Sequence, residues 1–146
     1  MVLNGIINVY KPAGMTSHDV IYKVRRITGI KKVGHTGTLD PDAQGVLPVC
    51  IGTGTKLSDM LTVSDKRYTA VMRLGLETDT QDLSGKVLYT KDVNVTPEEI
   101  KKAVLGFVGD ISQIPPMFSA VKVNGQKLYK LGRQGIEIER KPRSIS

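Results

Sequence analysis

A glycine-rich stretch that carries carboxylates, Val33–Gly54, is the part of the sequence best suited to chemistry. Small and apolar residues surround His35 and Asp40 there. Glycine lets a backbone approach a ligand closely, so a glycine-rich loop that presents Asp40 is a reasonable site. The pair Asp40–Pro41 is also typical of a plain surface turn, and on its own it favours that interpretation. Both readings stay open at this level.

Three ligand sites that such a loop could form are disfavoured by spacing. A phosphate-binding P-loop needs Gly-x-x-x-x-Gly-Lys-Ser/Thr, which residues 52–56 do not provide. A calcium loop that begins at Asp40 would have Ile51 where a bidentate glutamate is required. The 2 histidines and Cys50 lack the close paired spacing of a zinc site. We therefore expect no metal and no cofactor.

Other residues have two interpretations each. His35 lies five positions before Asp40 and could serve acid–base chemistry, or it could be hydrogen-bonded inside the loop. Arg67 and Tyr68 combine a cation with an aromatic ring, which suits a phosphate beside a stacked base, although a tyrosine in a strand is often plain core. Ser17 has no histidine–aspartate arrangement around it and is interpreted as the start of a helix.

The elements that must position these residues begin with a strand over Gly5–Tyr10 and a turn over 11–14. A helix then starts at Thr16, with Asp19 at the capping-box position and Gly29 as the C-cap. Its apolar stripe is predicted to be Val20, Val24 and Ile27, with Lys23 and Arg26 away from it.

Further strands are predicted at three places after the loop. Val46–Ile51 is suited to a buried strand, although Pro48 should restrict it to an edge or a bulge. Residues 68–74 alternate between two faces, which is typical of a strand, and 87–89 form another.

The second half begins with a helix and ends with extended segments. Thr96 starts that helix as a capping residue, with Pro97 at its first position, and the helix extends to Val108. Residues 119–123 form a strand, Asn124–Gly125 a tight turn, and a short helix or second strand follows from Gln126. The segment 137–146 is predicted to be a strand that stops within its pattern, so we expect a longer natural chain.

Composition places the chain among folded proteins and suggests a polyanionic partner. Of 146 residues, 40% are hydrophobic and 24% charged, which is typical of one globular domain. The net charge of +7 is concentrated in two basic segments, 10–36 and 122–146, around an acidic one. Such polarity suits a nucleic-acid partner, and charge alone fits a merely solvated surface equally well. A single cysteine and no apolar run of membrane-spanning length lead us to expect a cytoplasmic protein.

Elements and motifs together predict an α/β (α+β) fold, with a mixed, largely antiparallel sheet flanked by helices. The motifs resemble those of the TruB family of tRNA pseudouridine synthases. Residues 5–17 are similar to that family's first motif and residues 34–52 to its catalytic motif. Further similar segments follow in the family's order, namely Lys56, 65–68, 74–82, 113–122 and 127–137.

The resemblance implies the pseudouridine synthase fold and roles for particular residues. Asp40 would be the essential catalytic aspartate, and Tyr68 the aromatic residue that packs on the target base. His35 would belong to the loop that helps to turn out the T-arm nucleotides and stacks against them, and Lys56, Lys11 and Arg67 would contact RNA. The implied substrate is tRNA, bound through its T-arm, with the T-loop uridine at position 55 as target.

The resemblance also implies that the chain is incomplete. Residues 1–146 would be the N-terminal portion of the catalytic domain, without its remaining strands and a C-terminal RNA-binding domain. The arginine that pairs with Asp40 in the family would lie outside this chain. We expect a monomer, and the competing hypothesis is a non-catalytic RNA-binding module or an inactive fragment.

Overall fold

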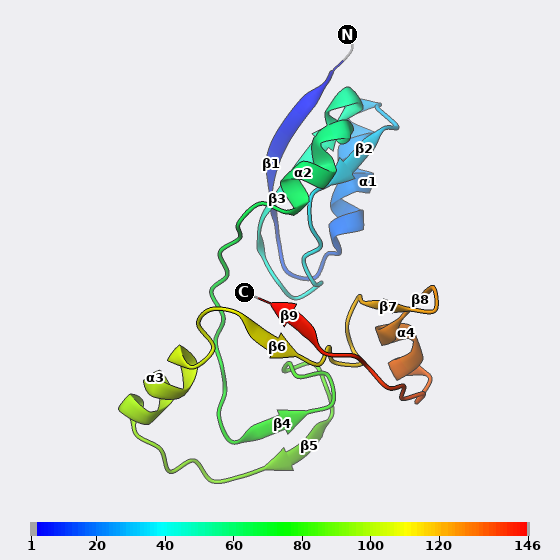
Figure 1. The fold of residues 1–146 in the computed structure, drawn as a ribbon. Helices are drawn as coiled ribbons and strands as arrows, with labels where there is room; N and C mark the ends of the chain where they lie inside the picture. Colours follow the sequence, from blue (N-terminus) through cyan, green and yellow to red (C-terminus); the bar gives the residue numbers. More distant parts are fainter. Residues whose placement is uncertain (1–2, 146) are drawn as a thin grey trace. The chain divides into compact units, whose positions relative to one another are not determined.

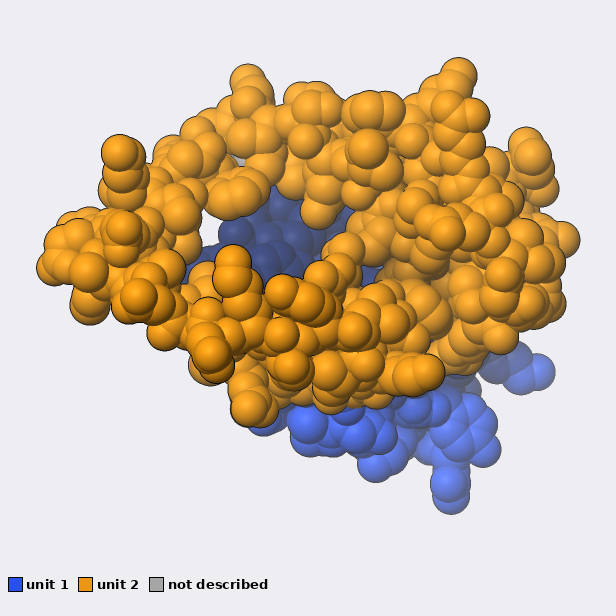
Figure 2. Space-filling model, turned by 90° about the horizontal axis from the view of Figure 1, so that it is seen from below, with its two compact units in different colours: residues 1–69 blue, residues 70–146 orange. Residues whose placement is uncertain are grey.

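The computed structural model describes residues 3–145 and divides the chain into two compact units. Unit 1 is Met1–Thr69 and unit 2 is Ala70–Ser146; Figure 2 shows them in different colours. Every residue that the sequence singled out as a site residue belongs to unit 1.

Unit 1 is built on a three-stranded antiparallel sheet (Figure 1). Its strands are β1 (Gly5–Lys11), β2 (Val33–His35) and β3 (Gly45–Ile51), in the order β1-β3-β2. The strand and the following turn predicted at the N-terminal end are confirmed. Strand β3 follows the Asp40 loop and lies in the centre of the sheet. Both β1 and β2 therefore pair with the strand that follows this loop.

The prediction that Pro48 would confine its strand to an edge or a bulge is wrong, since β3 pairs on both sides. The Pro48 carbonyl accepts a hydrogen bond of 3.2 Å from the Thr36 N–H, beyond the end of β2. The carbonyl and the N–H position of a strand residue point to the same side. The N–H that proline lacks therefore faces the side on which β2 has already ended at His35.

Helix α1 (Ser17–Thr28) begins as the sequence predicts. The Thr16 hydroxyl accepts from the Asp19 N–H (3.1 Å), and the Asp19 carboxylate accepts from the Thr16 N–H (2.8 Å). The Asp19 carboxylate also accepts from the Thr16 hydroxyl (2.6 Å), and this bond, followed by the one from the Thr16 N–H, lowers the pKa of Asp19. Gly29 closes the helix with φ 69°, a left-handed conformation that glycine adopts without a steric penalty. Both ends of α1 are thus fixed by local chemistry.

The core of unit 1 lies between α1 and the sheet. Ile27 was predicted to belong to it but is 84% exposed, and Ile21 takes that place with 2% exposure. The buried residues of α1 follow the spacing i, i+3, i+4, i+7 from Ser17 to Val24, and Ile27 lies off that face. The buried core residues are Val20, Ile21, Val24, Val33, Leu47, Val49 and Ile51.

After β3 the chain forms a 3₁₀ helix, η1 (Gly52–Leu57), and the short helix α2 (Ser58–Thr62). The strand predicted over 68–74 is wrong: these residues form no helix or strand, and Val71 is 97% exposed. A strand is stable only when its N–H and C=O groups pair with a neighbour. Within residues 3–145 no strand pairs with this segment.

Unit 2 contains three two-stranded antiparallel sheets among the described residues (Figure 1). Strand β4 (Leu76–Thr78) pairs with β5 (Val87–Thr90), which confirms the strand predicted over 87–89. Strand β6 (Ile111–Gln113) pairs with β9 (Arg143–Ile145). Of the extended segment predicted over 137–146, only β9 is a strand, and Ser146 lies outside the described residues.

Helix α3 (Pro97–Leu105) has the predicted start, a capping box between Thr96 and Glu99. The prediction that it extends to Val108 is wrong, since the helix ends at Leu105 with Gly106 as the C-cap. Glycine costs about 1 kcal/mol in a helix relative to alanine, so the helix has little reason to continue through it.

A hairpin and a helix follow in unit 2. The predicted turn at Asn124–Gly125 joins β7 (Lys122–Val123) to β8 (Gln126–Lys127), with φ values of 50° and 80° that suit a tight hairpin turn. The strand is shorter than the predicted 119–123, and the segment after the turn is a strand and then a helix, α4 (Leu128–Arg133). The predicted class, helices with largely antiparallel strands, is confirmed, although the strands form four small sheets among the described residues.

Candidate active site

Asp40 lies on the loop between β2 and β3, and its side chain is exposed. Its carboxylate makes no hydrogen bond or ion pair with any residue in the described range 3–145. The backbone around it is held: the Ala43 N–H donates to the Asp40 carbonyl over 3.1 Å. The loop therefore presents a carboxylate whose oxygens are available to a ligand.

The residue before Asp40 is fixed by a side chain of α1. The Leu39 N–H donates to the Ser17 hydroxyl over 2.9 Å, and that hydroxyl donates to the Leu39 carbonyl over 3.1 Å. Ser17 is 2% exposed, so water does not compete for these bonds. The sequence placed Ser17 at the helix start, which is confirmed, but gave no sign of its contact with the loop.

Lys11 lies beneath the same loop, and it is fully buried. Its ammonium group donates to the carbonyls of Pro12 (2.9 Å), Met15 (2.6 Å) and Pro41 (3.1 Å). An ammonium group has three N–H donors, and all three are used here. Lys11, predicted to contact RNA, thus has its charge directed at the backbone that follows Asp40, and its geometry favours a supporting role.

His35 ends β2, at the point where the loop begins, and it is half-buried. Its Nδ1 atom is buried and has no hydrogen-bond partner within the described residues. Burial lowers the pKa of His35. A neutral imidazole is therefore favoured at neutral pH, which suits a stacking or hydrogen-bonding role more than a fixed positive charge.

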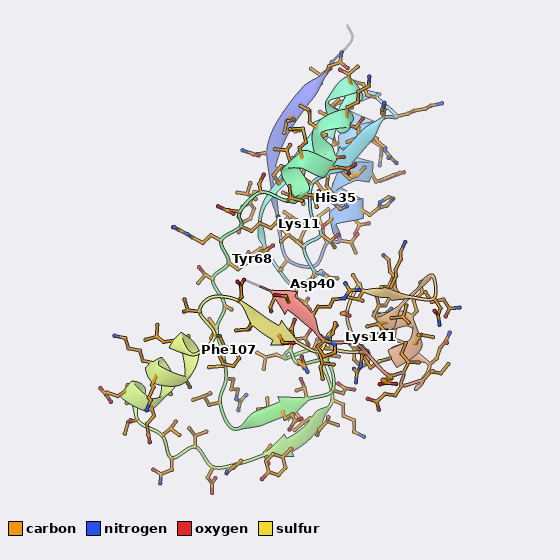
Figure 3. All side chains as sticks on the ribbon, viewed as in Figure 1. Lys11, His35, Asp40, Tyr68, Phe107 and Lys141 are labelled. Carbon is orange, nitrogen blue, oxygen red and sulfur yellow. The ribbon has the colours of Figure 1, made fainter. Side chains whose placement is uncertain are left out.

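An open pocket of about 290 Å³ lies beside the loop within unit 1. This volume is at the lower end for small-molecule sites. Arg67, Tyr68 and Leu39, the residue before Asp40, all line the pocket. The remaining lining comes from 36–38, the start of β3, Leu61 of α2 and 64–66. Figure 3 labels His35, Asp40 and Tyr68, which come from three different segments of unit 1.

The structure brings together only some of the predicted site residues. Arg67 and Tyr68 line the pocket, Asp40 lies on the adjoining loop, and Lys11 donates a hydrogen bond to the backbone of that loop. Lys56 is exposed on η1 and does not line the pocket. Leu61 and Ser64 line the pocket and were not singled out by the sequence, since no motif or charge distinguishes them.

The described residues form neither a metal site nor a membrane-spanning helix. Among residues 3–145, no three histidine, cysteine, aspartate or glutamate side chains gather as a metal site would require. No helix in the described part of the chain is long and apolar enough to cross a bilayer. The pocket is thus lined by a tyrosine ring, an arginine cation and the Asp65 carboxylate, and the exposed Asp40 carboxylate lies on the adjoining loop.

Known structures place this fold among proteins that share its arrangement of strands and helices. A chain in the crystal structure of a Cbf5–Nop10–Gar1 complex aligns with 96% of this chain and 32% of its own length, with a TM-score of 0.59 and 27% identity. The likeness supports the α+β class derived above from helices and antiparallel strands.

The family itself follows from the sequence comparison. Residues 25–146 match the model described as TruB family pseudouridylate synthase, N-terminal domain. This chain belongs to the TruB family of pseudouridylate synthases. The tRNA pseudouridine synthase B of Alkaliphilus oremlandii (strain OhILAs) is 55% identical over 144 residues, which are 99% of this chain and 48% of the relative. That of Clostridium novyi (strain NT) is 58% identical over 144 residues, 99% of this chain and 50% of the relative. The chain spans about half the length of these curated relatives.

Proposed function

We propose that the protein containing this chain isomerises uridine to pseudouridine in tRNA, at position 55 of the T-loop, with Asp40 as the essential carboxylate. The observation that supports this most is the placement of Asp40, an exposed carboxylate on a loop whose backbone is held at Leu39, Asp40 and Pro41. The curated relatives at 55% and 58% identity carry the name tRNA pseudouridine synthase B.

The proposed reaction is an isomerisation within one nucleotide, so a carboxylate and a means of positioning the base are its main requirements. The bond from the sugar C1′ to N1 of uracil breaks, the base turns, and C1′ bonds to C5, while the C5 proton is lost and N1 gains one. No electrons enter or leave, so the balance requires no oxidant, reductant or group donor. A carboxylate can assist as a nucleophile or by supporting elimination from the sugar. Positioning contributes much of the rate in such a site, which gives weight to the fixed loop.

The target base must leave its stack to reach Asp40. Base-modifying enzymes turn the nucleotide out into a pocket with aromatic contacts. Tyr68 lines the pocket beside the Asp40 loop and is 69% exposed, so its ring is available to pack on the uracil. Arg67, which also lines the pocket, would contact a neighbouring phosphate.

The RNA backbone would be held by exposed cations elsewhere in unit 1. Four basic side chains are exposed on α1 and in the turn before β2, with no acidic residue among positions 20–36; they are Lys23, Arg26, Lys31 and Lys32. The Arg26 guanidinium lies 6.0 Å from the centre of the Tyr22 ring. Phosphate contacts from such residues make tRNA affinity fall as salt rises. Lys56, exposed on η1, is a further proposed contact.

We also propose that residues 1–146 are the N-terminal portion of the catalytic domain. The chain spans about half of its curated relatives. The arginine that the family pairs with the catalytic aspartate would then come from the other half, together with a C-terminal RNA-binding domain. On this view residues 1–146 alone bind tRNA weakly and turn it over slowly or not at all.

The reaction is tested by tritium release from tRNA labelled at C5 of uridine. The natural full-length protein should release tritium from a transcript with uridine at position 55, and none from the same transcript with cytidine there. Binding of both transcripts should be similar, because the phosphate contacts are unchanged. A protein that binds both and releases tritium from neither is the non-catalytic RNA-binding module of the alternative hypothesis.

A further inference from the structure

We infer that Ser17 is a positioning residue for the catalytic step: its buried hydroxyl orients the peptide that carries Asp40. The inference rests on the proposed role of Asp40 and adds a residue to that site. Ser17 lies 22 positions before Leu39 in the sequence, and its one hydroxyl satisfies both the N–H and the C=O of that residue. A serine hydroxyl can donate one bond and accept two, so this pairing uses its donor and one acceptor.

The position of the hydroxyl is itself fixed. Ser17 is the first residue of α1, directly after the capping residue Thr16. Four positions later Ile21, with 2% exposure, anchors the same helix in the core of unit 1. The hydroxyl therefore projects from a rigid element toward a loop, which is how precise sites are commonly built.

The bonds act on the geometry of Asp40. The Leu39 carbonyl belongs to the planar peptide that joins Leu39 to Asp40, so holding that carbonyl fixes the plane on one side of the Asp40 Cα. On the other side, the Asp40 carbonyl accepts from the Ala43 N–H (3.1 Å). In the next peptide, the Pro41 carbonyl accepts from the Gly14 N–H (2.9 Å) and from the Lys11 ammonium (3.1 Å). The Asp40 carboxylate is then free to rotate only about its own side-chain bonds.

A purely structural role would have a different signature. A buried hydroxyl that only stabilises the fold would lower the melting temperature on removal, with catalysis intact in the folded fraction. A positioning role lowers kcat of fully folded protein, because the reacting carboxylate is misplaced. Substrate affinity, which depends on many phosphate contacts away from Leu39, should change little.

The chain offers a matched control at the other end of the same helix. The Thr28 hydroxyl donates to the Val24 carbonyl (2.8 Å) and accepts from the Ile30 N–H (3.3 Å), so it also bridges two backbone groups. Those groups belong to the C-terminal end of α1 and not to the Asp40 loop. Thr28→Val and Ser17→Ala thus remove similar hydrogen bonds at different distances from the site.

The test compares these variants in the natural full-length protein, well below their melting temperatures. For Ser17→Ala we expect kcat to fall about 10- to 100-fold with KM and tRNA Kd within about twofold of wild type. For Thr28→Val, kcat should stay within about twofold of wild type, while the melting temperature falls. A folded Ser17→Ala protein with wild-type kcat, or an equal kcat loss in Thr28→Val, would overturn the inference.

Two further variants separate a positioning role of Ser17 from misfolding and from failure of the proposed function. If Ser17→Ala does not fold, Ser17→Cys replaces it: a thiol is a weak donor and acceptor, so kcat should still fall severalfold, and a wild-type kcat would overturn the inference. Asp40→Asn is measured alongside. If that variant is as active as wild type, the proposed function has failed, whatever Ser17 does.

Discussion

Unit 1 and unit 2 differ in how they bury apolar side chains. Unit 1 has a core of seven residues from α1 and the sheet, all at most 7% exposed. In the described part of unit 2, Leu128 is the only hydrophobic side chain among the buried core residues. Phe107 is 70% exposed there and Leu88 59%. Figure 2 shows the atoms of unit 2 around an opening, in keeping with the lack of a filled core.

This difference shows which part of the chain can hold a site rigidly. The Asp40 loop is fixed to α1 and to β1 by side chains that are themselves buried, namely Ser17 and Lys11. The strand β5 exposes three consecutive residues, Val87, Leu88 and Tyr89, which is typical of a strand that needs cover on both faces. The packed core of unit 1 holds the candidate site, whereas most apolar side chains in the described part of unit 2 are exposed.

The largest expected effect contrasts core leucine with exposed leucine. Leu47 of β3 is 1% exposed, so Leu47→Ala should cost about 2–5 kcal/mol of unfolding free energy through lost burial and a cavity. Leu88→Ala in β5 should cost less than about 1 kcal/mol, because that side chain is already largely in water. Urea denaturation of residues 1–146 followed by circular dichroism measures both. Equal losses at the two positions would refute the contrast between the units.

A smaller effect is expected from the buried ammonium of unit 1. Lys11→Met keeps the length of the side chain but removes three charge-assisted hydrogen bonds, so it should cost about 1–3 kcal/mol. The amide of Gly14, which donates to Pro41, should also exchange faster with solvent. Lys56→Met, at an exposed position, is the control and should change neither quantity. An unchanged melting temperature for Lys11→Met would show that the three bonds contribute little.

The smallest effect concerns the pH dependence of unit 1. Burial lowers the pKa of His35 below its ordinary value of 6.5, so the unfolded chain binds this proton more tightly than the folded one. The stability from neutral His35 is thus present above pH 6.5 and is lost as pH falls through the folded pKa. Proton NMR should give a titration midpoint for His35 below 6.5. A midpoint above that value would contradict the burial of this side chain.

Local signals in the sequence predicted helix boundaries well. Both capping boxes, Thr16 with Asp19 and Thr96 with Glu99, depend on residues three positions apart, and both are present. The strand predictions failed where the presence or absence of a neighbouring strand decides the structure. Residues 68–74 have the alternation of a strand but no described neighbour to pair with, and Pro48 is tolerated in a central strand because β2 ends beside it.

The candidate site was also predictable only in part, because local motifs are visible in the sequence and long-range contacts are not. A motif resemblance singled out Asp40 and Tyr68, and the structure puts Tyr68 at a pocket beside the Asp40 loop. Their catalytic and base-packing roles stay predictions. The support of the loop could not be predicted, because Ser17 and Lys11 meet it across 22 and 30 positions of sequence. Contacts at such separations depend on the folded sheet and leave no local pattern.

The central claim is that the Asp40 carboxylate, and not acidity of the loop in general, performs the reaction. Asp42 is a matched control, since it is exposed on the same loop two positions later. Tritium release should be measured in the natural full-length protein for both aspartate-to-asparagine variants. Removal of a catalytic group commonly costs at least about 10³-fold, so Asp40→Asn should release essentially no tritium while Asp42→Asn stays near wild type. Release by Asp40→Asn at the rate of Asp42→Asn would contradict the assignment.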